Sequence, residues 1–193
     1  MKKRIPNALT VLRILLTPIF IVLVLMPGFL SKLLAAFVFI IAVSTDYFDG
    51  YFARKHNFMS NFGKLMDPIA DKCLLLAAFF IFTKLHLIAF WMFVLIFARE
   101  VVITLVRLWA MTKGKILPAE KAGKYKTVSQ MVTVVFILLF LILKELPFAF
   151  PGSGSLLVSS QHLIYILMWI AVSLTLVSGI LYLWQNRTFV YVS

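Results

Sequence analysis

Long apolar runs separated by short polar segments make up most of this chain. The apolar runs cover about residues 8–26, 33–53, 62–82, 87–111, 127–143 and 162–184. Each has close to the roughly 20 residues that an α-helix needs to cross a bilayer, and in lipid a helix satisfies its own backbone polar groups. The pattern predicts an all-α integral membrane bundle of six transmembrane helices, in a single domain over residues 1–193. Pro147 and the stretch PGSGS, residues 151–155, predict the longest uncharged loop.

The composition agrees with a membrane protein. Of the 193 residues, 63% are hydrophobic and 13% are charged, whereas soluble domains carry about 25% charged residues. The apolar start is not expected to be a cleaved signal peptide, because no small-residue cleavage site leads into polar sequence and further apolar runs follow. The single cysteine, Cys73, excludes a disulfide within the chain.

The basic residues lie mainly in alternate connections. The connections on one side, with the two ends of the chain, hold Lys2, Lys3, Arg4, Arg54, Lys55, Lys64, Lys113, Lys115, Lys121, Lys124, Lys126 and Arg187; those on the other hold Lys32, Lys84 and Lys144. The positive-inside rule therefore predicts that both termini are cytoplasmic. Because the net charge of +12 forms no continuous basic stripe, it indicates membrane orientation and an anionic ligand rather than a nucleic acid.

Four aspartates stand out in this apolar chain, which has only seven acidic residues. Asp46 and Asp49 are three residues apart, and Asp67 and Asp71 are four apart, so each pair shares a helix face. A short connection should make the two helices antiparallel neighbours, so that the pairs converge. An isolated carboxylate deep in a bilayer costs about 2.5–3.5 kcal/mol, while hard carboxylate oxygens suit Mg²⁺, Mn²⁺ or Ca²⁺. Two such ions could hold a phosphate for a displacement reaction.

Small residues beside the aspartates predict room for a ligand. Gly50 and Ala53 lie one turn apart, Gly63 begins the next helix, and the fork of Arg54 suits phosphate. Each also has a purely structural explanation. Gly50 and Ala53 could serve helix packing, and Arg54 could be a cytoplasmic anchor.

Together these residues form the pattern Asp46-x2-Asp49-Gly50-x2-Ala53-Arg54-x8-Gly63-x3-Asp67-x3-Asp71, which resembles the complete signature of the CDP-alcohol phosphotransferase family. The resemblance implies transfer of a substituted phosphate from a CDP-linked lipid to an alcohol, with release of CMP. It further implies that Asp46, Asp49 and Asp67, with Asp71, hold two Mg²⁺ or Mn²⁺ ions. Asp71 would act as the base, and Asp49, Gly50, Ala53, Arg54 and Gly63 would line the CDP site.

Three further stretches bear on the acceptor alcohol. Residues 5–13, IPNALTVLR, resemble the first helix of bacterial phosphatidylglycerophosphate synthases, and Asn7, Thr10 and Arg13 could reach the nucleotide from one helix face. Capping and snorkelling at the interface would explain the same residues. Arg99, next to Glu100, and Arg107 place charge inside the fourth apolar run.

Residues 123–127, GKYKT, resemble the Gly-Lys-x-Lys-Thr element of the same synthases. With Arg99 and Arg107, Lys124 and Lys126 would form a cationic pocket for the phosphate of sn-glycerol 3-phosphate. The two lysines could also be ordinary cytoplasmic residues that obey the positive-inside rule.

The expected activity is therefore transfer of a phosphatidyl group from CDP-diacylglycerol to glycerol 3-phosphate, at the cytoplasmic face of the cell membrane. Exposed apolar faces contact membrane lipids and would permit a homodimer. One departure weakens the acceptor assignment, because Leu108 follows Arg107 where such synthases often have glutamate. A cardiolipin synthase that uses phosphatidylglycerol stays open, and inositol-phosphate or serine acceptors are less favoured. A divalent-cation or proton-coupled transporter would leave Gly50, Ala53, Arg54 and Gly63 without a role.

Overall fold

The computed structural model describes the backbone of residues 5–56, 61–113, 121–146 and 153–187, and the side chains of residues 12–45, 72–113, 123–146 and 158–187. Within these ranges the chain forms six α-helices and no strand. The helices are α1 (Ile5–Leu25), α2 (Phe29–His56), α3 (Asn61–Lys84), α4 (Phe90–Thr112), α5 (Lys121–Lys144) and α6 (Ser153–Gln185). The all-α prediction with six helices is confirmed.

Two helices begin well before their apolar runs, by six and nine residues. Helix α5 includes the polar residues from Lys121 onward, and α6 begins at Ser153, so the prediction of a loop through residues 153–155 is wrong. Hydropathy marks only the apolar part of a helix, whereas serine and glycine directly after Pro151 are residues that favour a helix start. Helix α4 instead begins at Phe90, three residues after its apolar run.

The turn between α3 and α4 explains the late start of α4. His86 adopts a left-handed backbone with φ of 56°. The His86 amide donates to the Thr83 carbonyl at 3.0 Å and the Leu87 amide donates to the Phe82 carbonyl at 3.0 Å, which is the Schellman arrangement that ends a helix. Residues 85–89 are thereby used for the reversal of the chain.

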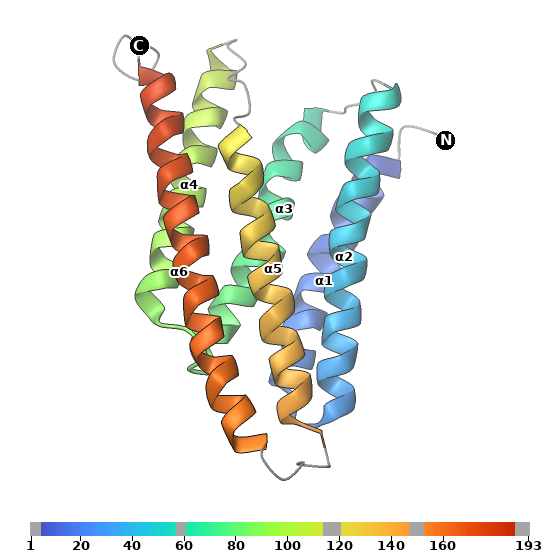
Figure 1. The fold of residues 1–193 in the computed structure, drawn as a ribbon. Coiled ribbons are helices and arrows are strands. Elements are labelled where there is room, and N and C mark those ends of the chain that lie inside the picture. Colours follow the sequence, from blue (N-terminus) through green and yellow to red (C-terminus); the bar gives the residue numbers. More distant parts are fainter. Residues whose placement is uncertain (1–4, 57–60, 114–120, 147–152, 188–193) are drawn as a thin grey trace.

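Successive helices run in opposite directions (Figure 1). The first residue of α1, Ile5, and the last residue of α6, Gln185, therefore lie at the same end of the bundle. Helix α1 packs against α2 and α3, and α6 packs against α4 and α5. Helices α2 and α3 each also contact α5, and α3 contacts α4. Direct contact between α2 and α3 is sparse, because α1 packs against both.

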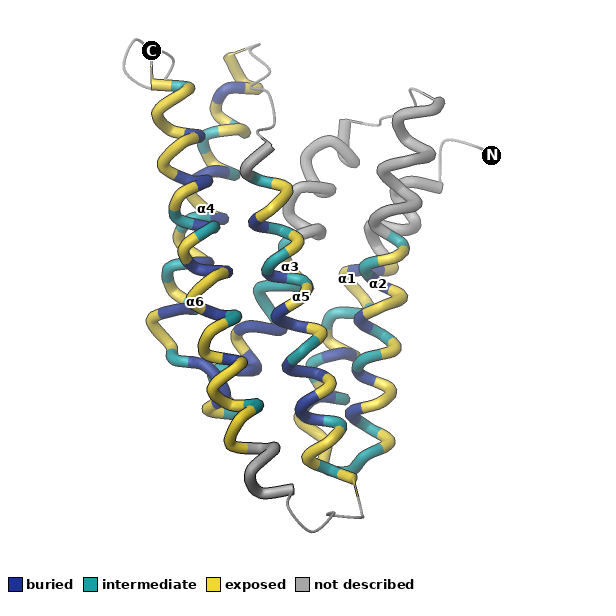
Figure 2. The backbone as a smooth tube through the Cα atoms, in the orientation of Figure 1, coloured by how far each residue is buried: buried dark blue, intermediate teal, exposed yellow. Residues whose placement is uncertain are grey.

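The hydrophobic core lies in the half of the bundle farther from Ile5 and Gln185 (Figure 2). Its largest side chains include Phe20, Phe39, Phe79, Phe82 and Met168, all 0–1% exposed. Towards the other end the interior becomes polar; the buried side chains there include Arg13, Glu100, Lys126, Gln130, Thr133, Thr175 and Ser178. Apart from Lys32 near the start of α2, the buried polar and charged side chains that the structure describes therefore lie towards this end.

Two of the described segments, 123–144 and 158–185, are long and apolar enough to cross a membrane. The outer faces of all helices with described side chains also expose large apolar residues, for example Phe37, Phe90, Leu105, Val132 and Trp184. Monomeric soluble proteins rarely expose contiguous apolar surface of such extent.

Candidate active site

The aspartate signature lies on helical backbone. Residues 46–56 form the last part of α2, and residues 61–71 form the first part of α3. Helical periodicity thus places Asp46 with Asp49, and Asp67 with Asp71, on one face of their respective helices. The side chains of all four aspartates lie outside the described residues, as do those of Asn7, Thr10, Ala53 and Arg54 and the surroundings of Gly50 and Gly63. Convergence of the four carboxylates stays a prediction.

The described part of the polar interior begins one residue after Asp71. Lys72 extends from α3 to Glu100 of α4, with its Nζ 3.1 Å from Glu100 Oε2. Lys126 reaches the other carboxylate oxygen, Oε1, from α5. The Arg99 Nη1 lies 3.2 Å from the same Oε1. Three cations from three helices therefore surround one carboxylate that is only 4% exposed, leaving two formal positive charges in excess.

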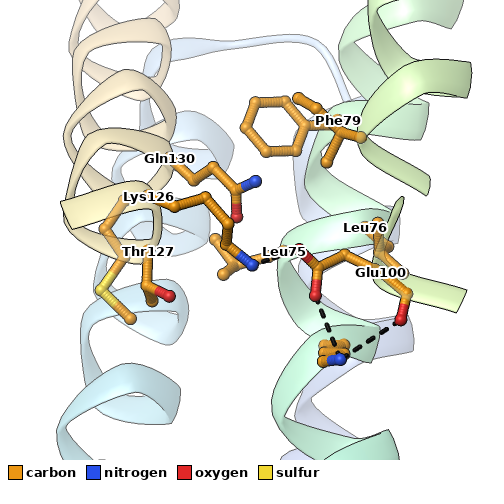
Figure 3. Close-up of a pocket in the computed structure, with 10 residues that line it drawn as sticks. Leu75, Leu76, Phe79, Glu100, Lys126, Thr127 and Gln130 are labelled. Atoms are coloured by element: carbon orange, nitrogen blue, oxygen red, sulfur yellow. Dashed lines mark hydrogen bonds and ion pairs between the residues drawn. The ribbon is translucent and has the colours of Figure 1, made fainter. Parts of the chain in front are cut away.

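A cavity of about 170 Å³ opens beside this cluster. Figure 3 shows the ends of the Lys126 and Glu100 side chains pointing towards one another at its wall, with Gln130 on the same helix as Lys126. Its apolar wall consists of Leu75, Leu76, Phe79, Ile96 and Met131, and its polar wall consists of Lys72, Glu100, Lys126, Thr127 and Gln130. The cavity can take a small anion with hydroxyl groups, because cations and hydrogen-bonding side chains share one wall.

Arg99 is held from the side of α6. Its Nη2 donates to Ser178 Oγ at 2.9 Å. Gly179 makes room for it, because a Cβ added there would come 3.0 Å from Arg99 Cγ. The Arg99 guanidinium thus links the Glu100 carboxylate to α6.

Arg107 and Lys124 do not line the cavity. The Arg107 guanidinium carbon lies 5.2 Å from the centroid of the Tyr182 ring, and its Nε donates to the Tyr182 hydroxyl at 3.4 Å. Lys124 is exposed, whereas Lys126 is buried. Two residues turn an α-helix by about 200°, so Lys124 and Lys126 point to nearly opposite sides of α5. Of the four cations predicted for the acceptor, the structure brings together Arg99 and Lys126.

Several polar residues of the cavity were not expected from the sequence. Lys72 follows the signature directly, and Gln130 lies one turn after Lys126, so helical periodicity could have indicated both. Gln130 donates through Nε2 to Thr175 Oγ1 at 3.0 Å, which joins α5 to α6. Glu100 was noted beside Arg99, but its position at the centre of the cluster depends on contacts between helices.

The side chains that the structure describes include no group of three histidine, cysteine, aspartate or glutamate residues able to hold a metal ion. The predicted metal ligands belong to the part whose side chains are not described. The backbone there is compatible with the prediction, because each aspartate pair shares a helix face and supplies the oxygen ligands that Mg²⁺ and Mn²⁺ prefer.

Comparison with known proteins covers nearly the whole chain. The sequence model of the CDP-alcohol phosphatidyltransferase family matches residues 3–177. A protein of Bacillus subtilis named CDP-diacylglycerol–glycerol-3-phosphate 3-phosphatidyltransferase is 38% identical over 94% of each chain. Proteins of the same name from Rickettsia typhi and Escherichia coli K12 are 34% identical over 97% of this chain and 99% of the relative, and 36% identical over 72% and 78% respectively.

Proposed function

This chain belongs to the CDP-alcohol phosphatidyltransferase family, and from that premise we propose that it transfers a phosphatidyl group from CDP-diacylglycerol to sn-glycerol 3-phosphate. The products are phosphatidylglycerophosphate and CMP. The observation that carries the proposal is the set of relatives bearing this enzyme name over almost the full length of the chain. The buried cationic cavity supports a small, doubly charged acceptor.

The enzyme is proposed to span the cell membrane with six helices and with both termini in the cytoplasm. The two long apolar segments and the exposed apolar faces of the other helices support a membrane location. The orientation rests on the lysines and arginines at the end that holds the starts of α1, α3 and α5. The aspartate signature lies at that same end, so the reaction takes place at the cytoplasmic face.

Asp46, Asp49 and Asp67, with Asp71, are proposed to hold two Mg²⁺ or Mn²⁺ ions, because the resemblance of their spacing to the family signature implies a metal site. When bound, such ions neutralise charge on the diphosphate and on the departing CMP. Gly50 and Ala53, small residues on α2 beside Asp46 and Asp49, leave room for the cytidine nucleotide.

Other residues of this end complete the proposed CDP site. Asn7 and Thr10 approach it from α1, Gly63 from the start of α3, and Arg54 binds phosphate oxygens. The position of the helical backbone is compatible with these roles, since α1 packs against both α2 and α3.

Asp71 is proposed to remove the proton from the attacking hydroxyl of glycerol 3-phosphate. An alcohol has a very high pKa, so attack on phosphorus needs a base within hydrogen-bonding reach. As the new bond from the glycerol oxygen to phosphorus forms, the bond from phosphorus to the CMP oxygen breaks, and Asp71 carries the proton away. Correct placement of the two substrates accounts for much of the catalysis in such a transfer.

The phosphate of the acceptor is proposed to bind at the cavity, with Lys126 as its direct partner and Arg99 behind it. Lys124 and Arg107 add positive charge from outside the cavity wall. A phosphate monoester carries about two negative charges at neutral pH, and the cluster has two formal positive charges in excess. A charge-assisted contact in a buried site is worth about 1.5–3 kcal/mol.

The proposal is tested with purified protein in detergent micelles that contain CDP-diacylglycerol. CMP release is followed with glycerol 3-phosphate, phosphatidylglycerol, inositol phosphate or serine as the acceptor. Release that depends on glycerol 3-phosphate supports the proposal. Release only with phosphatidylglycerol would replace it by cardiolipin synthesis, the alternative that the Arg107-Leu108 sequence leaves open.

A further inference from the structure

Glu100 lies at the centre of the cavity wall, although it is an anion in a site proposed to bind an anion. Its carboxylate is nearly fully buried, and both of its oxygens are used: Oε1 contacts Lys126 and Arg99, and Oε2 contacts Lys72. Burying a carboxylate is costly unless cations and hydrogen bonds compensate. Its presence here therefore calls for a role that a neutral side chain could not fill.

The hydrogen-bond donors of the two lysines are used differently. An ammonium group has three N–H donors. Lys72 donates to the Glu100 backbone carbonyl at 3.3 Å and to Thr104 Oγ1, and its Nζ forms an ion pair with Glu100 Oε2 at 3.1 Å. Lys126 contacts Glu100 Oε1 among the described residues, so two of its donors are available to a ligand in the cavity that it lines.

We infer that Glu100 is a positioning residue, which holds the Lys126 ammonium at the cavity and fixes it relative to the aspartate-bearing turn of α3. The inference rests on the proposed function, because it assigns the phosphate of the acceptor to the remaining donors of Lys126. Lys72 serves as the link to α3, through its ion pair with Glu100 and its hydrogen bonds to the Glu100 carbonyl and Thr104.

The link to α3 has a geometric consequence. Lys72 directly follows Asp71 in the same helix, and Lys72, Glu100 and Lys126 come from α3, α4 and α5. The ion pairs through Glu100 thus join the turn that carries the proposed base to the residue that binds the acceptor phosphate. Phosphoryl transfer depends strongly on the relative placement of the groups that bind the two reactants.

The kinetic test compares Glu100→Gln with the wild type. The variant keeps the size of the side chain and removes its negative charge, so Lys126 and Lys72 lose their common anionic partner. We expect the apparent KM for glycerol 3-phosphate to rise about tenfold or more, since charge-assisted contacts to phosphate are misplaced. The KM for CDP-diacylglycerol should stay within about twofold. An unchanged KM for glycerol 3-phosphate would overturn the inference.

A double variant separates positioning from a general effect on structure. If Glu100 acts through Lys126, then adding Glu100→Gln to Lys126→Met should raise the KM for glycerol 3-phosphate little further, because the two side chains form one unit. Independent effects that multiply would contradict the inference. Glu145→Gln, at the end of α5, is the matched control, since that carboxylate accepts a hydrogen bond from the Gly28 amide away from the cavity.

Direct binding of inorganic phosphate separates this inference from the proposed function. Phosphate should raise the melting temperature of the wild type and of Glu145→Gln, and should stabilise Glu100→Gln and Lys126→Met much less. Equal stabilisation of all four proteins would overturn the role of Glu100. A wild type that binds phosphate but does not consume glycerol 3-phosphate would overturn the proposed function alone.

If Glu100→Gln does not fold, Glu100→Asp provides the measurement. It keeps the charge but shortens the side chain by one methylene, so it should fold and show an intermediate KM for glycerol 3-phosphate. A wild-type KM in Glu100→Asp, with a wild-type response to phosphate, would show that the position of the carboxylate does not matter.

Discussion

Replacing Lys126 with methionine removes the only ammonium that we assign to direct contact with the acceptor phosphate. The side chain keeps its length and its fit against the cavity wall, but the charge and three donors are lost. Lys126 is 6% exposed and lines the cavity, whereas Lys124, two residues earlier on α5, is exposed and does not line it. Lys124→Met is therefore the matched variant, with the same chemical change on the opposite side of one helix.

The magnitude follows from the loss of one contact between a charged donor and phosphate. Such a contact is worth about 1.5–3 kcal/mol, and about 1.4 kcal/mol corresponds to a factor of ten. Lys126→Met should thus raise the KM for glycerol 3-phosphate by about tenfold to a hundredfold, while Lys124→Met should raise it less than about threefold. Neither variant should change the KM for CDP-diacylglycerol strongly.

The assay is steady-state CMP release with glycerol 3-phosphate varied at saturating CDP-diacylglycerol. Lys144→Met, at the exposed far end of α5, controls for loss of a lysine from this helix. Equal rises in KM for Lys124→Met and Lys126→Met would refute the assignment. They would show that the two lysines act through general positive charge at the surface.

Three further predictions concern the metal site, the base and the stability of the bundle. Excess chelator, or Asp67→Asn in a protein that still folds, should abolish CMP release; full turnover in chelator would contradict a metal-dependent reaction. Asp71→Asn should lower kcat by roughly two to four orders of magnitude and weaken binding of CDP-diacylglycerol less than Asp46→Asn does, and equal weakening would make Asp71 only a ligand. Lys32→Met should lower the free energy of unfolding by about 2–4 kcal/mol, because the buried Lys32 ammonium donates at 2.6 Å to the carbonyls of both Val24 and Met26 at the end of α1. The melting temperature of Lys32→Met in detergent should fall by roughly 5–15 °C. A melting temperature equal to that of Lys144→Met would show that the bonds from Lys32 to the carbonyls at the end of α1 do not stabilise the bundle.

The helices of this protein could be predicted from the sequence because their apolar runs are long. The length and spacing of these runs indicated six helices, and short polar segments separated them. Hydropathy failed where a helix continues into polar sequence, as in α5, which begins at Lys121. It also missed the turn around His86, where a left-handed backbone follows the end of α3. Helix α4 therefore begins at Phe90, three residues after the start of its apolar run.

Only part of the candidate site could be predicted. The spacing of the aspartates and the element around Lys126 are local patterns, so they can be recognised without a structure. The partner of Lys72 is 28 residues away on α4, and Arg107 meets Tyr182 from 75 residues away. Such contacts depend on how the helices pack, which local periodicity does not determine. For that reason the contact of Arg107 with Tyr182 and the central place of Glu100 were not predicted.

The identity of the acceptor is the central claim of this account. The most direct measurement supplies wild-type protein with CDP-diacylglycerol and glycerol 3-phosphate, quantifies CMP, and determines the mass of the lipid product. We predict one phosphatidylglycerophosphate formed for each CMP released, and no CMP above background when glycerol 3-phosphate is left out. CMP release that ignores glycerol 3-phosphate but requires phosphatidylglycerol, with cardiolipin as the product, would contradict the account.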